Sequence, residues 1–168
     1  MTGRIMLSFP VGGMRFNYRV AGAAIRDGHL LVCREDDDDY CMLPGGRVEM
    51  GEPSPVALMR EMAEELVMPV EIGRLLFTSE SFYGRVGERF HELGFIYAID
   101  LPDSVRPDGA QPFLSRADEG HVLHFSWLPL HGPALAEANL LPPWLPTRLR
   151  ALSPASEHVV LHEGEVGE

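Results

Sequence analysis

The feature that most constrains this chain is one long segment with helical periodicity, from Ser54 to about Val67, set among segments that alternate like β-strands. Ser54 is a residue type that caps helix N-termini, and Pro55 suits the first helical position. Pro69 disfavours helical backbone at the residue before it and so ends the helix nearby. A helix of this kind among many strands predicts an α/β fold of the α+β type, with a mixed β-sheet covered by helices.

Short alternating or apolar segments predict the strands. We expect them at residues 16–25, 29–33, 71–78 and 90–101, and around Leu123, Phe125 and Trp127. Asp27-Gly28 is a strong hairpin signal, and two short helices are expected after Pro133 and after Pro143. No linker or repeat divides residues 1–168, so we predict a single domain, in which the residues from about 153 onward form either an edge strand or a frayed tail.

Charge and composition exclude several classes of function. All 14 basic residues are arginine, and the absence of lysine excludes a Walker-A phosphate loop, Schiff-base chemistry and pyridoxal phosphate attachment. The formal net charge of −11 argues against a nucleic-acid backbone as the main partner. An anionic substrate would therefore need another source of positive charge, and a divalent cation is the obvious candidate.

Two cysteines, Cys33 and Cys41, are too few for a disulfide framework or a four-cysteine zinc site. We interpret both as small buried hydrophobic residues. The sequence also lacks a signal peptide and any apolar run long enough to span a membrane. A reducing, cytoplasmic location without membrane association is the expectation.

The predicted helix carries an unusual charge pattern. Glu61, Glu64 and Glu65 lie within about 100° of arc on one face. We expect the opposite face to be buried against the sheet; it carries Met59, Met62, Ala63 and Leu66. The three glutamates are either a solvated acidic face or a site for hard divalent cations, whose preferred ligands are oxygens.

The stretch GRVEMGEPSPVALMREMAEELVM, residues 46–68, resembles the signature of the Nudix hydrolases, G-x5-E-x7-R-E-U-x-E-E-x-G-U, where U is a bulky aliphatic residue. Eight of the nine constrained positions agree; they are Gly46, Glu52, Arg60, Glu61, Met62, Glu64, Glu65 and Met68. Val67 stands where the family carries a glycine that ends the helix in a left-handed conformation, which a β-branched residue resists. We therefore expect the helix end to be built differently, with Pro69 as the stop.

The resemblance implies a Nudix-like α/β/α sandwich and hydrolysis of a diphosphate bond in a nucleoside diphosphate linked to another moiety, with Mg²⁺ or Mn²⁺ as cofactor. It implies that the cations are bound by the carboxylates of Glu61, Glu64 and Glu65 and by the carbonyl oxygen of Gly45. Glu119, in a later loop, is a candidate additional ligand or base. The resemblance leaves the catalytic base open between Glu61 and such a loop carboxylate.

Other residues are candidates for supporting roles. Glu52 and Arg60 are expected to orient the metal ligands, the alternative being a surface salt bridge. Glu92 is a candidate for facing the diphosphate, and Phe82 and Tyr83 for stacking on a base or sugar. The alternatives are a surface carboxylate and ordinary core aromatic residues. His91, His121 and His124 are interpreted as structural.

Two other functions stay open. A regulatory module of the same fold would bind a nucleotide or an ADP-ribose-like ligand without turnover, but it would be expected to lose its glutamates. An isomerase acting on an allylic diphosphate would need an active-site cysteine, and neither Cys33 nor Cys41 is clearly placed for that role. The expected partner is a nucleotide-type small molecule, and the sequence leaves a homodimer open.

Overall fold

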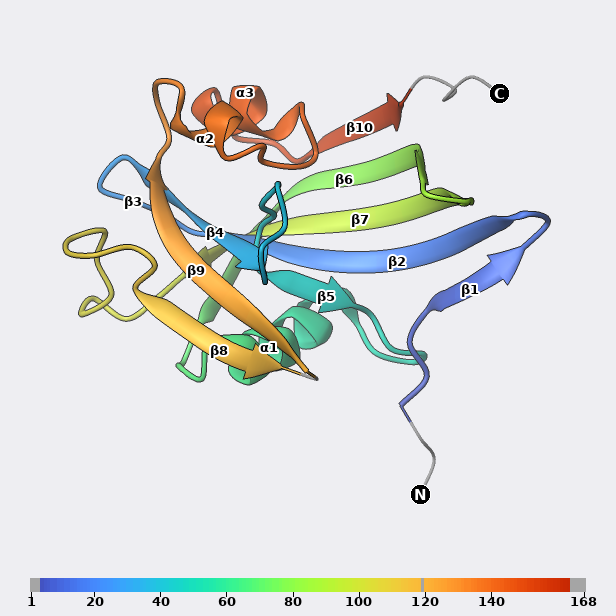
Figure 1. Cartoon of the computed structure of the whole chain (residues 1–168), viewed down its shortest axis with the longest axis horizontal. Helices are drawn as coiled ribbons and strands as arrows, with labels where there is room; N and C mark the ends of the chain where they lie inside the picture. The colour runs from blue at the N-terminus through green and yellow to red at the C-terminus, as the bar shows by residue number, and fades with distance from the viewer. Residues whose placement is uncertain (1–3, 119, 164–168) are drawn as a thin grey trace.

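A computed structural model describes residues 4–118 and 120–163 of the chain. Their strands lie between helix α1 on one side and the short helices α2 and α3 on the other (Figure 1). The helices are α1 (Ser54–Glu65), α2 (Ala134–Glu137) and α3 (Leu145–Arg150). The strands are β1 (Ser8–Val11), β2 (Met14–Ala23), β3 (Ile25–Arg26), β4 (His29–Glu35), β5 (Gly45–Arg47), β6 (Glu71–Arg85), β7 (Glu88–Asp100), β8 (Leu114–Asp118), β9 (His121–Pro129) and β10 (Glu157–His162).

The strands form two sheets. The larger has the order β1-β2-β7-β6-β10, with β5 also pairing with β2, and the smaller has the order β3-β4-β9-β8. In the larger sheet β2 runs parallel to β7 and β10 runs parallel to β6, whereas the other pairs are antiparallel. The predicted mixed sheet covered by helices is confirmed.

The predicted strands are present, whereas β1, β5 and β8 were not predicted from the sequence. Asp27 (φ 48°) and Gly28 (φ 73°) both have the positive φ that a two-residue hairpin turn requires, and they join β3 to β4. Strand β6 continues to Arg85, beyond the predicted end at residue 78, because it forms a long antiparallel pair with β7. The segment after residue 153 contains β10, an edge strand of the larger sheet, so the edge-strand alternative is correct for 157–162.

Two hydrophobic cores hold the layers together, and β4 contributes to both. Leu31 and Cys33 join the core that contains α1, whereas Leu30 and Val32 join the core that contains α2 and α3. Burial on both faces explains why β4 is a continuous apolar run rather than an alternating one. Within the described residues no helix is long and apolar enough to cross a membrane.

The first turn of α1 differs from the prediction. Pro53, not Ser54, is the N-cap residue, and no side chain caps this end. The hydroxyl group of Ser54 instead lies 2.7 Å from the hydroxyl group of Tyr97 on β7. The prediction that Ser54 caps the helix is therefore wrong, because its side chain forms a hydrogen bond with the neighbouring sheet.

The buried face of α1 also differs from the prediction. Met62 and Leu66 are buried as expected, but Met59 is 51% exposed and Ala63 is exposed. Their places in the buried face are taken by Ala57, Leu58, Glu61 and Glu65. The helix is thus rotated so that two of its glutamates point inward, which apolar periodicity could not anticipate.

Helix α1 ends before Val67, and the expected continuation to Pro69 is wrong. Glu65 is the last helical residue and Leu66 is the C-cap. Val67 has φ 53°, the left-handed conformation that glycine adopts most readily, and its side chain is 61% exposed. The backbone therefore keeps the geometry of a glycine-terminated helix although the residue is a valine.

Candidate active site

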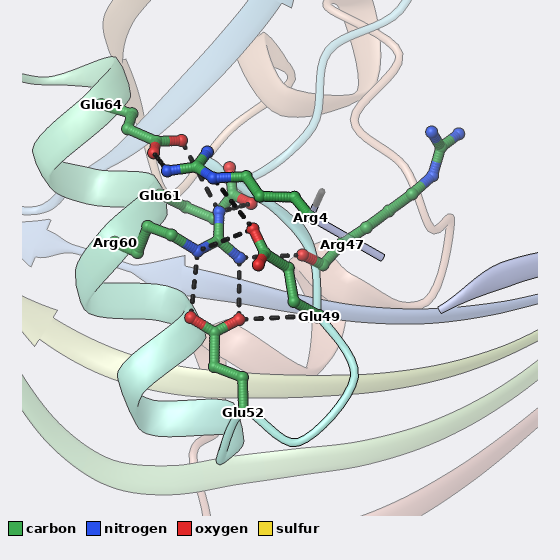
Figure 2. Close-up of polar contacts among 7 residues, drawn as sticks. All are labelled: Arg4, Arg47, Glu49, Glu52, Arg60, Glu61 and Glu64. Atoms are coloured by element: carbon green, nitrogen blue, oxygen red, sulfur yellow. Dashed lines mark hydrogen bonds and ion pairs between the residues drawn. The ribbon is translucent and has the colours of Figure 1, made fainter. Parts of the chain in front are cut away.

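Arg60 lies at the centre of a network of carboxylates around α1 (Figure 2). Its Nε donates to Glu52 Oε1 at 3.0 Å and its Nη2 to Glu52 Oε2 at 2.9 Å. Its Nη1 donates to Glu61 Oε1 at 2.7 Å, and Nη2 also reaches the carbonyl oxygen of Arg47 at 3.1 Å. Glu52 Oε2 in addition accepts the backbone N–H of Glu49 at 3.2 Å. The guanidinium group therefore fixes the orientation of the Glu61 side chain.

The network shifts the pKa values of its members in opposite directions. The hydrogen bonds from Arg60 hold the pKa of Glu52 below its usual range, and those to Glu52 raise the pKa of Arg60. Burial raises the pKa of Glu61, although the hydrogen bond from Arg60 opposes this effect. Glu61 is thus a buried carboxylate whose ionised form is held in place by one guanidinium group.

Glu61 and Glu65 line a recess of about 240 Å³ between α1, β4 and β5. The two residues are only 9% and 8% exposed, and the backbone of Gly45 lines the same recess. Charged groups are rarely buried unless they are paired or bind a metal ion. Carboxylate and carbonyl oxygens are the ligands that Mg²⁺ and Mn²⁺ prefer, so this set of donors fits such a cation.

Gly45 and Gly46, which precede the helix, are required because other atoms of the chain lie where their side chains would be. A Cβ atom on Gly46 would lie 2.3–2.5 Å from the carboxylate atoms of Glu61. A Cβ atom on Gly45, which has φ 148°, would lie 2.2 Å from the carbonyl oxygen of Val20. Any side chain at these positions would fill the space that the buried carboxylate occupies or push β5 away from β2.

Glu64 is placed differently from the other two glutamates. Its side chain is 41% exposed and does not line the recess. Its Oε1 accepts a hydrogen bond from Arg4 Nη2 at 2.7 Å, and its Oε2 lies 3.6 Å from Arg60 Nη1 (Figure 2). The structure therefore brings Glu61 and Glu65 together in one recess, whereas Glu64 lies outside it and is bound by the guanidinium group of Arg4.

A larger cavity of about 500 Å³ adjoins the recess and shares lining residues with it. Glu92 and Tyr83 line this cavity. Phe82 does not, because successive residues of a strand point to opposite faces. The ring of Phe82 instead packs against His91 and stacks on His162 on the other face of the sheet. The expectation that Phe82 and Tyr83 line one site is wrong for Phe82.

Sequence reasoning missed two arginines at the junction of the recess and the cavity. Arg19 on β2 and Arg47 on β5 are directly opposite each other and line both spaces. Neither guanidinium group forms a hydrogen bond or an ion pair with residues 4–118 or 120–163. In Figure 2 the Arg47 side chain extends away from the network. The alternation of β2, with Tyr18 and Val20 on one face, was a signal that Arg19 lies on the other.

Two further sequence expectations concern Cys33 and Glu119, and the structure adds one cluster that no pattern indicated. Cys33 lines the recess, but burial and then the charge of Glu65 raise the pKa of this thiol, so it remains a neutral group. Side-chain ligand atoms of Glu35, Asp36 and His121 lie within 4.8 Å of one another, which the sequence did not predict because His121 is 85 residues from Asp36. Glu119 lies outside the described residues.

Comparison with known proteins agrees with the fold and with the position of the glutamate helix. The family model of the NUDIX domain matches residues 17–147. The solution structure of the E. coli ORF135 protein is 25% identical in sequence, with a TM-score of 0.50 over 88% of this chain and 100% of that chain. The mutator MutT protein from Bacillus halodurans is 14% identical, with a TM-score of 0.58 over 90% and 93% of the two chains.

A UDP-X diphosphatase is 16% identical, with a TM-score of 0.54 over 85% of this chain and 66% of that chain. The similarity to the last two structures is one of fold. No curated protein matches the sequence. Because the family model covers most of the chain and includes the glutamate helix, the chain belongs to the NUDIX-domain family, and its class is that of the Nudix pyrophosphohydrolases, which act on phosphorus-containing anhydrides.

Proposed function

We propose that this chain hydrolyses the diphosphate bond of a nucleoside diphosphate linked to another moiety, with Mg²⁺ or Mn²⁺ as cofactor. The observation that carries the proposal is the recess in which the buried carboxylates of Glu61 and Glu65 face the backbone of Gly45. Burying two carboxylates costs free energy, and a divalent cation would offset that cost. When bound there, a cation neutralises diphosphate charge and lowers the pKa of an attacking water molecule.

The chain's own residues supply the positioning. Glu61, Glu65 and the Gly45 carbonyl oxygen would hold the cation, joined by Glu64 once its carboxylate leaves Arg4. Arg60 and Glu52 keep Glu61 in one orientation through the hydrogen bonds described above. Glu119 stays a candidate for a further ligand or base.

Arg19 and Arg47 would bind the phosphate oxygens. Like charges directly opposite on neighbouring strands repel. Two guanidinium groups that form no hydrogen bond within residues 4–118 and 120–163 therefore favour an anion between them. Water then adds to one phosphorus atom and gives its proton to a carboxylate base, for which Glu61 and Glu119 are the candidates. The bridging P–O bond breaks, and the leaving phosphate keeps the electron pair.

A screen with purified protein tests the proposal. Nucleoside triphosphates, nucleotide sugars, ADP-ribose and dinucleoside polyphosphates are incubated with Mg²⁺ or Mn²⁺, and the phosphate products are quantified. We expect hydrolysis of at least one class, complete loss in excess EDTA, and recovery when Mg²⁺ is added back. Binding without any turnover would instead indicate the regulatory module, and undiminished hydrolysis in EDTA would exclude the metal site.

The expectations about nucleic-acid binding and cellular location rest on composition, and they are part of this proposal. The charge of −11 argues against nucleic-acid backbone binding, and two buried thiols are compatible with a reducing cytoplasm. A homodimer stays open, and size-exclusion chromatography with light scattering would decide it.

A further inference from the structure

The larger cavity has a floor made by strands β2, β7 and β6, whose residues lie in register. One cross-strand row contains Arg19, Gly94 and Ser79, and the next contains Asn17, Glu92 and Ser81. The two rows are about 7 Å apart along the strands. Gly94 has no side chain, and Ser79 Oγ lies 2.6 Å from where its Cβ atom would be, so only glycine fits in the Arg19 row beside this hydroxyl group.

The charge along this floor changes sign from one row to the next. Arg19 and Arg47 stand where the cavity meets the recess, whereas Glu92 lies one row farther from it. A diphosphate is attracted to the arginine end and repelled from the carboxylate end. These charges would orient a bound nucleotide with its phosphates at the recess and its uncharged part beside Glu92.

Glu92 is a half-buried carboxylate, and among the described residues only its Oε2 accepts hydrogen bonds. Its Oε2 accepts hydrogen bonds from the hydroxyl group of Tyr83 at 3.1 Å and from Asn17 Nδ2 at 3.5 Å. Asn17 is only 3% exposed and is itself held by Ser8, whose hydroxyl group donates to Asn17 Oδ1 at 2.7 Å. Burial, and then the charge of Glu92, raise the pKa of Tyr83, which therefore stays protonated and donates. These contacts fix the carboxylate and leave Oε1 as an acceptor.

The walls of the cavity suit a flat ring. The rings of Tyr83 and Phe90 are stacked at 4.9 Å with an interplanar angle of 7°. Arg85 lies 4.7 Å from the ring centre of Tyr40 and bonds its hydroxyl group at 2.9 Å, which closes one side. Leu141, Pro142 and Leu161 add apolar surface, and the volume of about 500 Å³ is ample for a nucleoside.

We propose that this cavity selects nucleobases that carry an exocyclic amino group, and that Glu92 determines this specificity by accepting a hydrogen bond from that group. Guanine and cytosine offer such a donor, whereas hypoxanthine and uracil, which have the same ring frameworks, do not. A carboxylate oxygen that faces a bound base without receiving a hydrogen bond weakens the binding of that base, because the charge has lost its water without gaining a donor. This inference rests on the proposed function for the position of the phosphates.

The test uses α,β-methylene nucleoside diphosphates, which cannot be hydrolysed at that bond, with the full chain and Mg²⁺ in a calorimetric titration. We expect the guanosine analogue to bind about 10- to 100-fold more tightly than the inosine analogue, and the cytidine analogue more tightly than the uridine analogue by a similar factor. In Glu92→Gln both ratios should fall below about 3, because an amide can accept or donate. The control variant is Glu80→Gln, whose carboxylate bonds His158 on the opposite face of the sheet.

The inference is overturned if the wild-type chain binds both analogues of each pair equally, or binds no analogue. This outcome does not depend on whether Glu92→Gln folds. A uniform loss for all four analogues in Glu92→Gln would also overturn it and would assign Glu92 to the sugar. Turnover of the natural diphosphates is measured separately. Selective binding without hydrolysis would refute the proposed function alone, and hydrolysis without selectivity would refute this inference alone.

Discussion

Arg60 binds Glu52 through two parallel hydrogen bonds, at 3.0 Å and 2.9 Å, and uses its remaining nitrogen to hold Glu61. The three side chains are 16%, 15% and 11% exposed. A bidentate guanidinium–carboxylate pair gives directional as well as electrostatic stabilisation. One residue outside the recess therefore controls the geometry of a carboxylate inside it.

Replacing Arg60 should destabilise the fold more than replacing a surface arginine. Arg60→Met leaves two nearly buried carboxylates without their partner, and we expect a loss of about 3–5 kcal/mol in the free energy of unfolding. Arg60→Lys, which keeps the charge but not the paired geometry, should lose about 1–2 kcal/mol. Urea denaturation measures both. Arg15→Met, which breaks the more exposed pair with Glu88, is the control and should cost about 1 kcal/mol or less; an equal loss in the two methionine variants would contradict the account.

Acid should remove the contribution of Glu52. Arg60 lowers the pKa of Glu52 in the folded chain. The resulting stabilisation is therefore fully present at a pH above the pKa of the unfolded chain, about 4.3, and it is lost as the pH falls through the lower pKa of the folded chain. Glu52→Gln cannot titrate, so the difference in stability between wild type and this variant should shrink as pH is lowered from 6 towards 3. Thermal melts in metal-free buffer give this difference. A difference that stays constant with pH would show that the carboxylate gains nothing from Arg60.

Val67→Gly should stabilise the chain. Removing a β-branched side chain at φ 53° relieves strain of about 1–2 kcal/mol, and the added flexibility of the unfolded chain offsets part of it. We expect a net gain of about 0.5–1 kcal/mol and an unchanged Mg²⁺ affinity, because the valine supplies no ligand atom. Val56→Gly is the matched control: Val56 is also exposed, but it lies within α1 and should lose about 1 kcal/mol. Destabilisation by Val67→Gly would mean that position 67 carries no strain.

Arg4 should compete with the cation for Glu64. Its guanidinium group forms a 2.7 Å contact with the carboxylate and is 57% exposed. Arg4→Ala should therefore tighten Mg²⁺ binding several-fold, while the stability of the metal-free chain changes by less than about 1 kcal/mol. Competition of this kind should weaken as ionic strength rises. Calorimetric Mg²⁺ titrations at two salt concentrations check it, and weaker Mg²⁺ binding in Arg4→Ala would assign Arg4 a supporting role instead.

Local signals in the sequence predicted much of the fold. The Asp27-Gly28 turn, the alternation of Leu123, Phe125 and Trp127, and the helix after Pro53 depend on short-range preferences that the structure keeps. The resemblance to the Nudix signature implied that Glu61 and Glu65 share a site with the backbone of Gly45, and all three line the recess.

What the sequence could not predict depends on contacts between distant segments. The rotation of α1 that buries Glu61 and exposes Met59 is set by packing against both sheets. The left-handed backbone at Val67 overrides the preference of valine. The pairing of Arg19 with Arg47 follows from strand register, which residue types alone do not specify. Phe82 and Tyr83 point to opposite faces because β6 continues past residue 78, where the sequence predicted its end.

The most direct test of the central claim is Mn²⁺ binding, followed by electron paramagnetic resonance, in wild type, Glu65→Gln and the control Glu71→Gln. Glu65 lies in the recess, whereas Glu71 is an exposed residue at the start of β6. We expect wild type and Glu71→Gln to bind Mn²⁺ equally, and Glu65→Gln to bind at least 10-fold more weakly and to lose hydrolysis by orders of magnitude while remaining folded. Undiminished Mn²⁺ affinity and turnover in Glu65→Gln would contradict the account, because the recess would then not be the metal site.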